Sequence, residues 1–194
     1  MLVIGFGHRA RQGKNTAALA FMEAAPIAAD IKLCAFADAL KAEVRHACIQ
    51  TGGAGLLIEG FKEAGLMPDW VHDEIGKPRT LLQWWGTDYR RKKDPDYWVK
   101  RLQKSIADRD PHIVLVTDVR FMNEVDFIHS LNGYVIKVIK DGPPDIDVHP
   151  HASEAILDGF TGWDYTLQAA TLPELKQKGH ALYLEIEKAH GQKQ

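Results

Sequence analysis

The start of the chain constrains the fold more than any other part of the sequence. It reads Met1-Leu-Val-Ile-Gly-Phe-Gly-His-Arg-Ala-Arg-Gln-Gly-Lys-Asn-Thr16, an apolar stretch that runs into a short loop ending in Gly13-Lys14. An alanine-rich stretch over residues 16–25 follows at once and predicts a helix. This order is typical of a phosphate-binding loop, because the N–H groups at a helix start and a nearby lysine together attract phosphate oxygens.

The loop departs from the pattern Gly-x-x-x-x-Gly-Lys-Ser/Thr at two positions. His8 stands where the first glycine belongs, and Asn15 separates the lysine from the hydroxyl of Thr16. The alternative interpretation is an ordinary strand-to-helix turn with a surface lysine. On the first interpretation, we expect the phosphates of a nucleotide to be bound by Arg11, Gln12, Gly13, Lys14, Asn15 and Thr16.

Composition excludes several classes of protein. The 194 residues suffice for one domain with a substantial core. A net charge of −2 gives no overall basic field, so we expect no nucleic-acid partner. No apolar run is long enough for a membrane span, and the first strand leaves no room for a signal peptide. Two cysteines without a CxxC pattern favour reduced thiols and a cytoplasmic location.

Strand-like and helix-like segments alternate along the chain. The continuous apolar run at residues 113–117 is typical of a buried parallel strand. The alternation predicts an α/β fold, with a parallel sheet covered by helices on both faces. We expect strands at 2–6, 32–36, 113–117, 134–139 and 165–167, and helices at 16–25, 37–50, 80–91, 96–108, 123–131 and 172–189.

The chain is expected to form a single domain over residues 1–194. Residues 51–78 are rich in glycine and proline and could form a substrate-binding or lid insertion with one short helix. The polar loop at 140–150 is a second candidate for a moving cover.

Two charged residues follow the apolar run at 113–117. Asp118 is expected just past the carboxyl end of a strand, where ligands of α/β sheets gather and where an acid can hold Mg²⁺. Its alternative role is a helix N-cap. Arg120 could neutralise charge on a transferred phosphoryl group, or form a salt bridge to Glu124 four residues on.

A second set of polar residues lies on the helices predicted at 80–91 and 37–50. At helical spacings of three and four, Arg79, Gln83, Thr87 and Arg90 or Arg91 share a stripe that could bind a phosphate and a base edge. The alternative is a solvated helix face with the neighbouring tryptophans in the core. Lys41 and Arg45, which follow Asp38, could bind an acceptor phosphate or form an ordinary surface stripe.

A metal site of protein ligands alone is poorly supported. His149 and His151 lie in a polar loop, but no third ligand stands at a suitable spacing. His151 could equally cap a helix with Ser153 and Glu154.

With these residues in view, the chain resembles the bacteriophage deoxynucleoside monophosphate kinase family. The resemblance rests on segments in the family's order over residues 1–168: Gly13-Lys-Asn-Thr16, Phe36-Ala-Asp-Ala-Leu-Lys41, Leu82-Gln-Trp-Trp-Gly-Thr-Asp-Tyr-Arg90 with Asp96-Tyr-Trp98, Asp118-Val-Arg-Phe-Met-Asn-Glu124 and His151-Ala-Ser-Glu154. It implies a P-loop kinase fold and transfer of the γ-phosphoryl of ATP to a deoxynucleoside monophosphate (dNMP).

The resemblance also implies roles for residues. Catalysis would fall to Lys14, Asp118 and Arg120, and Mg²⁺ would be held by Asn15, Thr16 and Asp118, although the family often has Asp where this chain has Asn15. The acceptor would contact Asp38, Lys41, Arg45, Arg79, Gln83, Arg90 and Trp98, where an aromatic ring such as that of Trp98 or Tyr89 could crowd a 2′-hydroxyl.

Two other functions remain open from the sequence. One is a P-loop kinase for another small phosphorylated metabolite, and the other is a regulatory protein that binds a nucleotide without transfer chemistry. The resemblance is compatible with a homodimer, in whose interface Trp70, Trp84 or Trp85 could lie.

Overall fold

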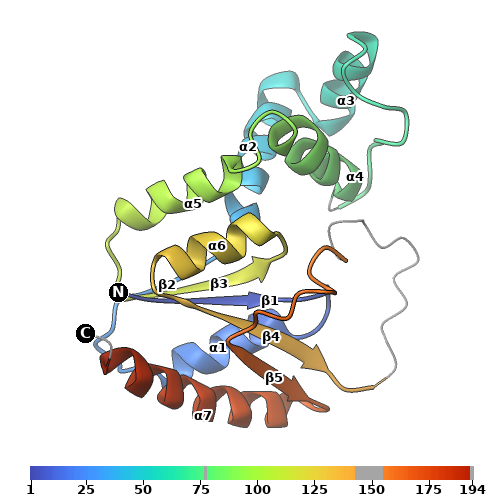
Figure 1. Ribbon diagram of the computed structural model, residues 1–194. Helices are drawn as coiled ribbons and strands as arrows, with labels where there is room; N and C mark the ends of the chain where they lie inside the picture. Colours follow the sequence, from blue (N-terminus) through green and yellow to red (C-terminus); the bar gives the residue numbers. More distant parts are fainter. Residues whose placement is uncertain (77, 143–154, 193–194) are drawn as a thin grey trace. The chain divides into compact units, whose positions relative to one another are not determined.

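The fold is built on one parallel sheet. The computed structural model describes residues 1–76, 78–142 and 155–192. Its five strands lie in the order β2-β3-β1-β4-β5, and all four neighbouring pairs are parallel (Figure 1). The strands are β1 (Leu2–Gly7), β2 (Ile31–Cys34), β3 (Ile113–Val119), β4 (Tyr134–Lys140) and β5 (Tyr165–Ala169).

Helical segments fill most of the remaining chain. Contacts divide the protein into two compact units, the first formed by residues 1–35 and 104–194 and the second by residues 36–103. The helices are α1 (Lys14–Ala24), α2 (Phe36–Thr51), α3 (Ala54–Glu63), α4 (Arg79–Gln83), α5 (Tyr97–Ala107), α6 (Met122–Ser130) and α7 (Leu172–Gly191), and one π-helix, η1, spans Trp84–Arg91.

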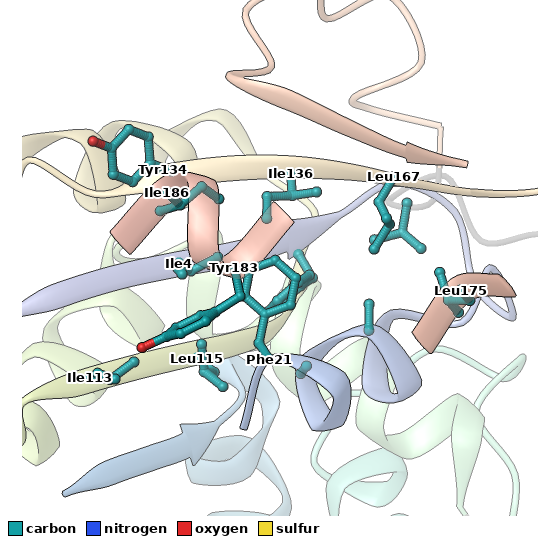
Figure 2. Packing of buried hydrophobic residues seen from close by; sticks show 14 of the residues in the cluster. Ile4, Phe21, Ile113, Leu115, Tyr134, Ile136, Leu167, Leu175, Tyr183 and Ile186 are labelled. Carbon is teal, nitrogen blue, oxygen red and sulfur yellow. The ribbon is translucent and has the colours of Figure 1, made fainter. Parts of the chain in front are cut away.

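In the first unit, helices cover both faces of the sheet. α6 lies on one face and α1 and α7 on the other (Figure 1). Alternate residues of β1 therefore face different helices. Phe6 packs edge-on against Phe21 of α1, with ring centroids 5.0 Å apart, and Phe21 in turn meets Tyr183 of α7 at 5.8 Å. Figure 2 shows this apolar layer, in which Ile4 and Leu115 lie beside these rings.

Gly5 of β1 faces α6, and the close approach of that helix explains the glycine. A β-carbon at this position would lie 2.3 Å from Cδ1 of Ile128 and 2.8 Å from Cγ2 of Val119. Both distances are well inside van der Waals contact, so α6 packs directly on the strand that leads to the loop. Together with the contact between Phe6 and Phe21, β1 is thereby packed against helices on both faces.

In the second unit, aromatic residues hold α3 against the π-helix. The rings of Trp84 and Tyr89 stack with centroids 5.1 Å apart, and Phe61 of α3 meets Trp84 edge-on at 5.5 Å. The buried Nε1 of Trp98 donates a hydrogen bond to the carbonyl of Gly86, 3.0 Å away. Gly86 lies against Leu40 of α2, where a β-carbon would come within 2.9 Å of Cδ2.

The predicted α/β class is confirmed, and each expected strand and helix is present. Two boundaries differ in ways that affect the site. β3 continues to Val119, so Asp118 lies inside the strand rather than past its end. The helix expected at 80–91 changes at Trp84 into a π-helix, whose i→i+5 bonding is visible in the hydrogen bond from the N–H of Lys92 to the carbonyl of Thr87. The predicted stripe of Arg79, Gln83, Thr87 and Arg90 or Arg91 therefore spans an α-helix and a π-helix, and it stays a prediction.

Other expectations concern the outer parts of the chain. Residues 51–76 and 78, expected as an insertion, belong to the second unit and contain α3. The single domain with such an insertion stays a prediction. Most of the loop expected to move, residues 143–150, lies outside the described residues, as do His149 and His151. Among the helices that are described, none combines the length and apolar character needed to cross a bilayer.

Candidate active site

The loop between β1 and α1 contains residues with a left-handed backbone. Gly13, which precedes the helix, has φ 93°, and His8 has φ 91°. Both values lie in the left-handed region that glycine enters most easily. His8 thus adopts, at some cost in strain, the kind of conformation that a glycine would supply at the first motif position.

The side chain of Lys14 folds back into this loop. Its Nζ donates hydrogen bonds to the carbonyl oxygens of His8, at 3.1 Å, and Arg9, at 2.5 Å, and the residue is only 8% exposed. The carbonyl of Gly13 accepts the first helical hydrogen bond, from Ala17. A helix start leaves its first N–H groups without intrahelical partners. The loop therefore presents an ammonium group and helix N–H groups together, a combination suited to phosphate oxygens.

The far side of the loop is tied to β4. The side-chain oxygen of Gln12 accepts a hydrogen bond from the backbone N–H of Lys140 at 2.9 Å. Arg11, with φ 59°, and Asn15 are exposed, and Thr16 is half-buried in the first turn of α1. All six residues predicted to bind the nucleotide phosphates consequently lie in one loop and helix start.

The carboxyl end of β3 lies beside the start of this loop. Val119 is the register partner of Gly7 in β1, so Asp118 and Arg120 flank the point where the loop begins. A β-carbon on Gly7 would lie 3.2 Å from the carbonyl oxygen of Val119. Asp118 and Arg120 are both half-buried. The two charged residues that the sequence singled out are therefore next to the phosphate loop.

Glu124 holds the turn that carries Arg120. Its carboxylate is 1% exposed and accepts hydrogen bonds from the backbone N–H groups of Arg120, at 2.7 Å, and Phe121, at 3.2 Å. Phe121 precedes α6, so Glu124 satisfies N–H groups at a helix start in the manner of a capping residue. These hydrogen bonds join the carboxylate to the backbone, and the salt bridge between Arg120 and Glu124 that the sequence suggested stays a prediction.

Several residues around the loop were not recognised from the sequence. Asp158 forms a two-point ion pair with Arg9, at 3.0 Å to Nε and 2.7 Å to Nη2. The hydrogen bond from Arg9 holds the pKa of Asp158 below its usual range. Lys137 of β4 is the register partner of Gly7. Burial, together with the charge of Lys137, lowers the pKa of His8, which favours the neutral imidazole. The sequence carried no local signal for these contacts.

In the second unit, Arg90 is the most firmly held of the predicted acceptor residues. Its Nε and Nη2 both bind Oε1 of Glu43 in α2. Its guanidinium carbon lies 5.0 Å from the ring centroids of Tyr89 and Tyr97. Glu43 was not predicted from the sequence, and it holds Arg90, which was predicted, in place.

The other predicted acceptor residues differ widely in exposure. Asp38 and Lys41 approach each other at 3.4 Å with both side chains more than half exposed. Arg45 and Arg79 are exposed and Gln83 is half-buried, whereas Trp98 is 2% exposed. Its burial and its hydrogen bond to Gly86 make Trp98 part of the packing of the second unit. Within the described residues, no cluster of three or more His, Cys, Asp or Glu side chains could hold a metal ion.

A loop with a buried lysine, set between the first strand and the first helix of a parallel sheet, is the arrangement of the P-loop class of nucleotide-binding proteins. The chain belongs to the deoxynucleotide monophosphate kinase family, whose family model matches residues 72–178. A putative deoxynucleotide monophosphate kinase of Acanthamoeba polyphaga mimivirus is 30% identical over 187 residues, which cover 86% of this chain and 88% of that protein. The deoxynucleoside-5′-monophosphate kinase of Escherichia phage T5 is 36% identical over 77 residues, 39% of this chain and 29% of that protein.

The protein is accordingly an ATP-dependent deoxynucleoside monophosphate kinase. Among solved structures, an unliganded sugar kinase from a Janibacter species is similar at TM-score 0.47 and 13% identity, covering 97% of both chains. Shikimate kinase from Aquifex aeolicus is similar at TM-score 0.48 and 12% identity, covering 95% of this chain and 96% of that one. Both TM-scores are below 0.5.

Proposed function

We propose that the loop at residues 7–16 binds the β- and γ-phosphates of ATP and that Lys14 is the main group in phosphoryl transfer. The observation that carries this assignment is the burial of Lys14 with its Nζ on the carbonyls of His8 and Arg9. When the phosphates enter, the ammonium exchanges these carbonyls for phosphate oxygens, while Gly13 and the first turn of α1 supply N–H groups.

In this proposal, the enzyme accelerates phosphoryl transfer mainly by neutralising the charge on the phosphate groups. The acceptor phosphate is already anionic, so the reaction needs positioning and stabilisation of charge rather than a strong base. Arg120, held through its backbone by Glu124, is the proposed cation for the transferred phosphoryl group. Arg120 directly follows Val119, the register partner of Gly7, and this closeness to the loop supports the role.

Mg²⁺ is the proposed companion of ATP. The hydroxyl of Thr16 and the carboxylate of Asp118 are hard oxygen donors, and Mg²⁺ characteristically combines one or two carboxylates with substrate phosphates and water. They fit such an ion, with Asn15 as an outer ligand. Bound there, Mg²⁺ would neutralise charge on the β- and γ-phosphates.

The acceptor dNMP is assigned to the second unit. We propose that Arg90 binds its phosphate and that Gln83, Arg79, Lys41, Arg45 and Asp38 contribute further polar contacts. The buried Trp98 would support this surface by packing under Gly86, and its burial speaks against a direct contact with the 2′ position.

The test is ADP formation from ATP and Mg²⁺, with each common dNMP and NMP added singly. Lys14→Ala serves as the blank. Lys62→Ala controls for loss of a lysine, because Lys62 is half-buried and bonded to the carbonyl of Asp69. We expect acceptor-dependent ADP formation that Lys14→Ala reduces about a thousandfold or more. ADP formation that ignores the acceptor, or full activity in Lys14→Ala, would contradict the proposal.

Assembly and location are also proposals. Of the three tryptophans considered for a homodimer interface, Trp70 is exposed, whereas Trp84 and Trp85 are buried within the chain. A homodimer would therefore use the surface around Trp70, which light scattering of Trp70→Ser would test. We propose the cytoplasm, where ATP and dNMPs occur, as the place of action, and a net charge of −2 supports a function without nucleic acid.

A further inference from the structure

Glu43 is the centre of a hydrogen-bond network in the second unit. Oε1 accepts hydrogen bonds from Nε1 of Trp85, at 3.0 Å, and from Nε of Arg90, at 2.5 Å. Oε2 accepts a hydrogen bond from the hydroxyl of Tyr97 at 2.9 Å. A single carboxylate thus joins α2, the π-helix and α5.

The network keeps Glu43 charged. Burial raises the pKa of Glu43, but the hydrogen bonds from Trp85, Tyr97 and Arg90 and the charge of Arg90 lower it, and the net shift is downward. At neutral pH the pair is therefore a carboxylate and a guanidinium, and its hydrogen bonds are of the strong, charge-assisted kind.

The pair is oriented, with Arg90 toward solvent. The side chain of Glu43 is 16% exposed and that of Arg90 is 28% exposed. Glu43 engages Nε and Nη2 of the guanidinium, and within the described residues Nη1 makes no hydrogen bond. Arg90 therefore uses Nε and Nη2 to bond to the protein, and its Nη1 group can donate a hydrogen bond to a bound anion.

Aromatic rings restrict the remaining motion of Arg90. Besides the two tyrosine rings at 5.0 Å, the ring of Trp85 lies 5.9 Å from the guanidinium carbon. Such rings attract a cation without using its N–H groups. An arginine held by a carboxylate and three rings has lost most of its rotamer freedom before a ligand binds, so binding costs less entropy.

We infer that Glu43 is a positioning residue, which acts by presenting Arg90 to the phosphate of the acceptor dNMP. This inference rests on the proposed role of Arg90. Glu43 itself touches no substrate. Its removal should therefore weaken acceptor binding selectively, whereas a purely structural role would lower stability and affect both substrates alike.

The experiment measures KM separately for the preferred dNMP and for ATP in Glu43→Gln, which keeps the size of the side chain but removes its charge. We expect KM for the dNMP to rise about tenfold to a hundredfold, the usual worth of a hydrogen bond to a charged group, with KM for ATP within about twofold of wild type. Lys100→Gln is the matched control, because it breaks the exposed Asp94–Lys100 ion pair of the same unit and should leave both KM values unchanged.

A second variant covers the case in which Glu43→Gln does not fold. Tyr97→Phe removes one hydrogen bond from Oε2 and leaves the ion pair in place, and should raise KM for the dNMP about twofold to fivefold. An unchanged KM for the dNMP in the folded variants, or an equal rise for both substrates, would overturn the role of Glu43 alone. A wild-type enzyme that forms no ADP with any acceptor would overturn the proposed function and this role together.

Discussion

Arg9 and Asp158 are 149 residues apart in the chain and form an ion pair through both oxygens of the carboxylate. Arg9 belongs to the loop between β1 and α1, the proposed phosphate-binding loop, and Asp158 lies before β5. Nearby, the ring of Trp163 packs where a β-carbon on Gly7 would lie, within 2.6 Å. Residues 158–163 therefore contact the loop and the end of β1 at two points, Arg9 and Gly7. The pair is partly exposed, so its worth to stability is at most about 1 kcal/mol, and its effect is to restrict the loop.

The left-handed backbone at His8 leads to a first prediction. His8→Gly should leave stability within about 1 kcal/mol of wild type, because relief of strain offsets the greater freedom of glycine in the unfolded chain. His8→Val should cost about 2 kcal/mol more than His8→Gly, because a β-branched residue fits a positive φ poorly.

Urea unfolding of both variants measures this difference. Each variant lacks the imidazole, so the contrast between them reports the backbone alone. Equal stabilities would show that φ at position 8 relaxes. ATP KM in His8→Gly should stay within about threefold of wild type, because glycine is the usual residue at this motif position.

A variant of Trp98 tests whether this residue serves in packing or contacts the substrate. Trp98→Phe removes the hydrogen bond to the carbonyl of Gly86 and part of a buried ring, and should destabilise the protein by about 1–3 kcal/mol. KM for the dNMP should change by less than about threefold. Thermal unfolding and steady-state kinetics provide the two readouts. A large rise in dNMP KM at unchanged stability would instead make Trp98 a substrate contact.

The depressed pKa of Glu43 predicts a loss of stability in acid. A carboxyl whose pKa is lower in the folded state contributes stability above its unfolded pKa, and this contribution is lost as pH falls through the folded pKa. The stability gap between wild type and Glu43→Gln should therefore be constant near neutral pH and narrow below about pH 4.3, the ordinary pKa of glutamate.

Unfolding midpoints in urea, taken for both proteins from pH 7 to pH 3, check this behaviour. A gap that is independent of pH over this range would mean that Glu43 is not preferentially ionised in the folded state. Other acidic pairs, such as Arg9–Asp158, titrate equally in both proteins and cancel in the comparison.

Thr16 and Asn15 provide a test of the metal contact. Thr16→Ala should raise the Mg²⁺ concentration needed for half-maximal rate about tenfold, because it removes a direct oxygen ligand. Asn15→Ala, at the exposed neighbouring position, should raise it less than about threefold. Rates measured across a Mg²⁺ titration at fixed ATP compare the two. The reverse order would move the direct ligand to Asn15.

The fold was predictable because its signals are local. The apolar run at 113–117 and the loop ending in Gly13-Lys14 each contain their own information, and the structure places Asp118 and Arg120 beside that loop as the order of the strands required. The partners of the loop and of the acceptor candidates were not predictable. Glu43 and Arg90 are 47 residues apart, and no spacing rule connects residues on different elements.

The π-helix also could not be predicted from the local sequence. Residues 84–91 have a composition that suits an ordinary helix, and only packing decides between the two forms. Trp98 donates a hydrogen bond to Gly86, and Gly86 packs against Leu40. These contacts join different elements, and the wider turn of the π-helix accommodates them. The stripe of Arg79, Gln83, Thr87 and Arg90 or Arg91 stays a prediction, because its second half lies in this π-helix.

The direction in which the side chain of Arg90 points depends on the number of residues in each turn of the π-helix. A turn closed by i→i+5 bonds takes up one residue more than a turn closed by i→i+4 bonds. Deleting one residue between Trp84 and Tyr89 would let the segment close as an ordinary helix and keep the later side chains near their present faces, whereas the same deletion in an ordinary helix would swing them by about 100° around the axis. This segment can thus lose one residue without turning Arg90 away from Glu43.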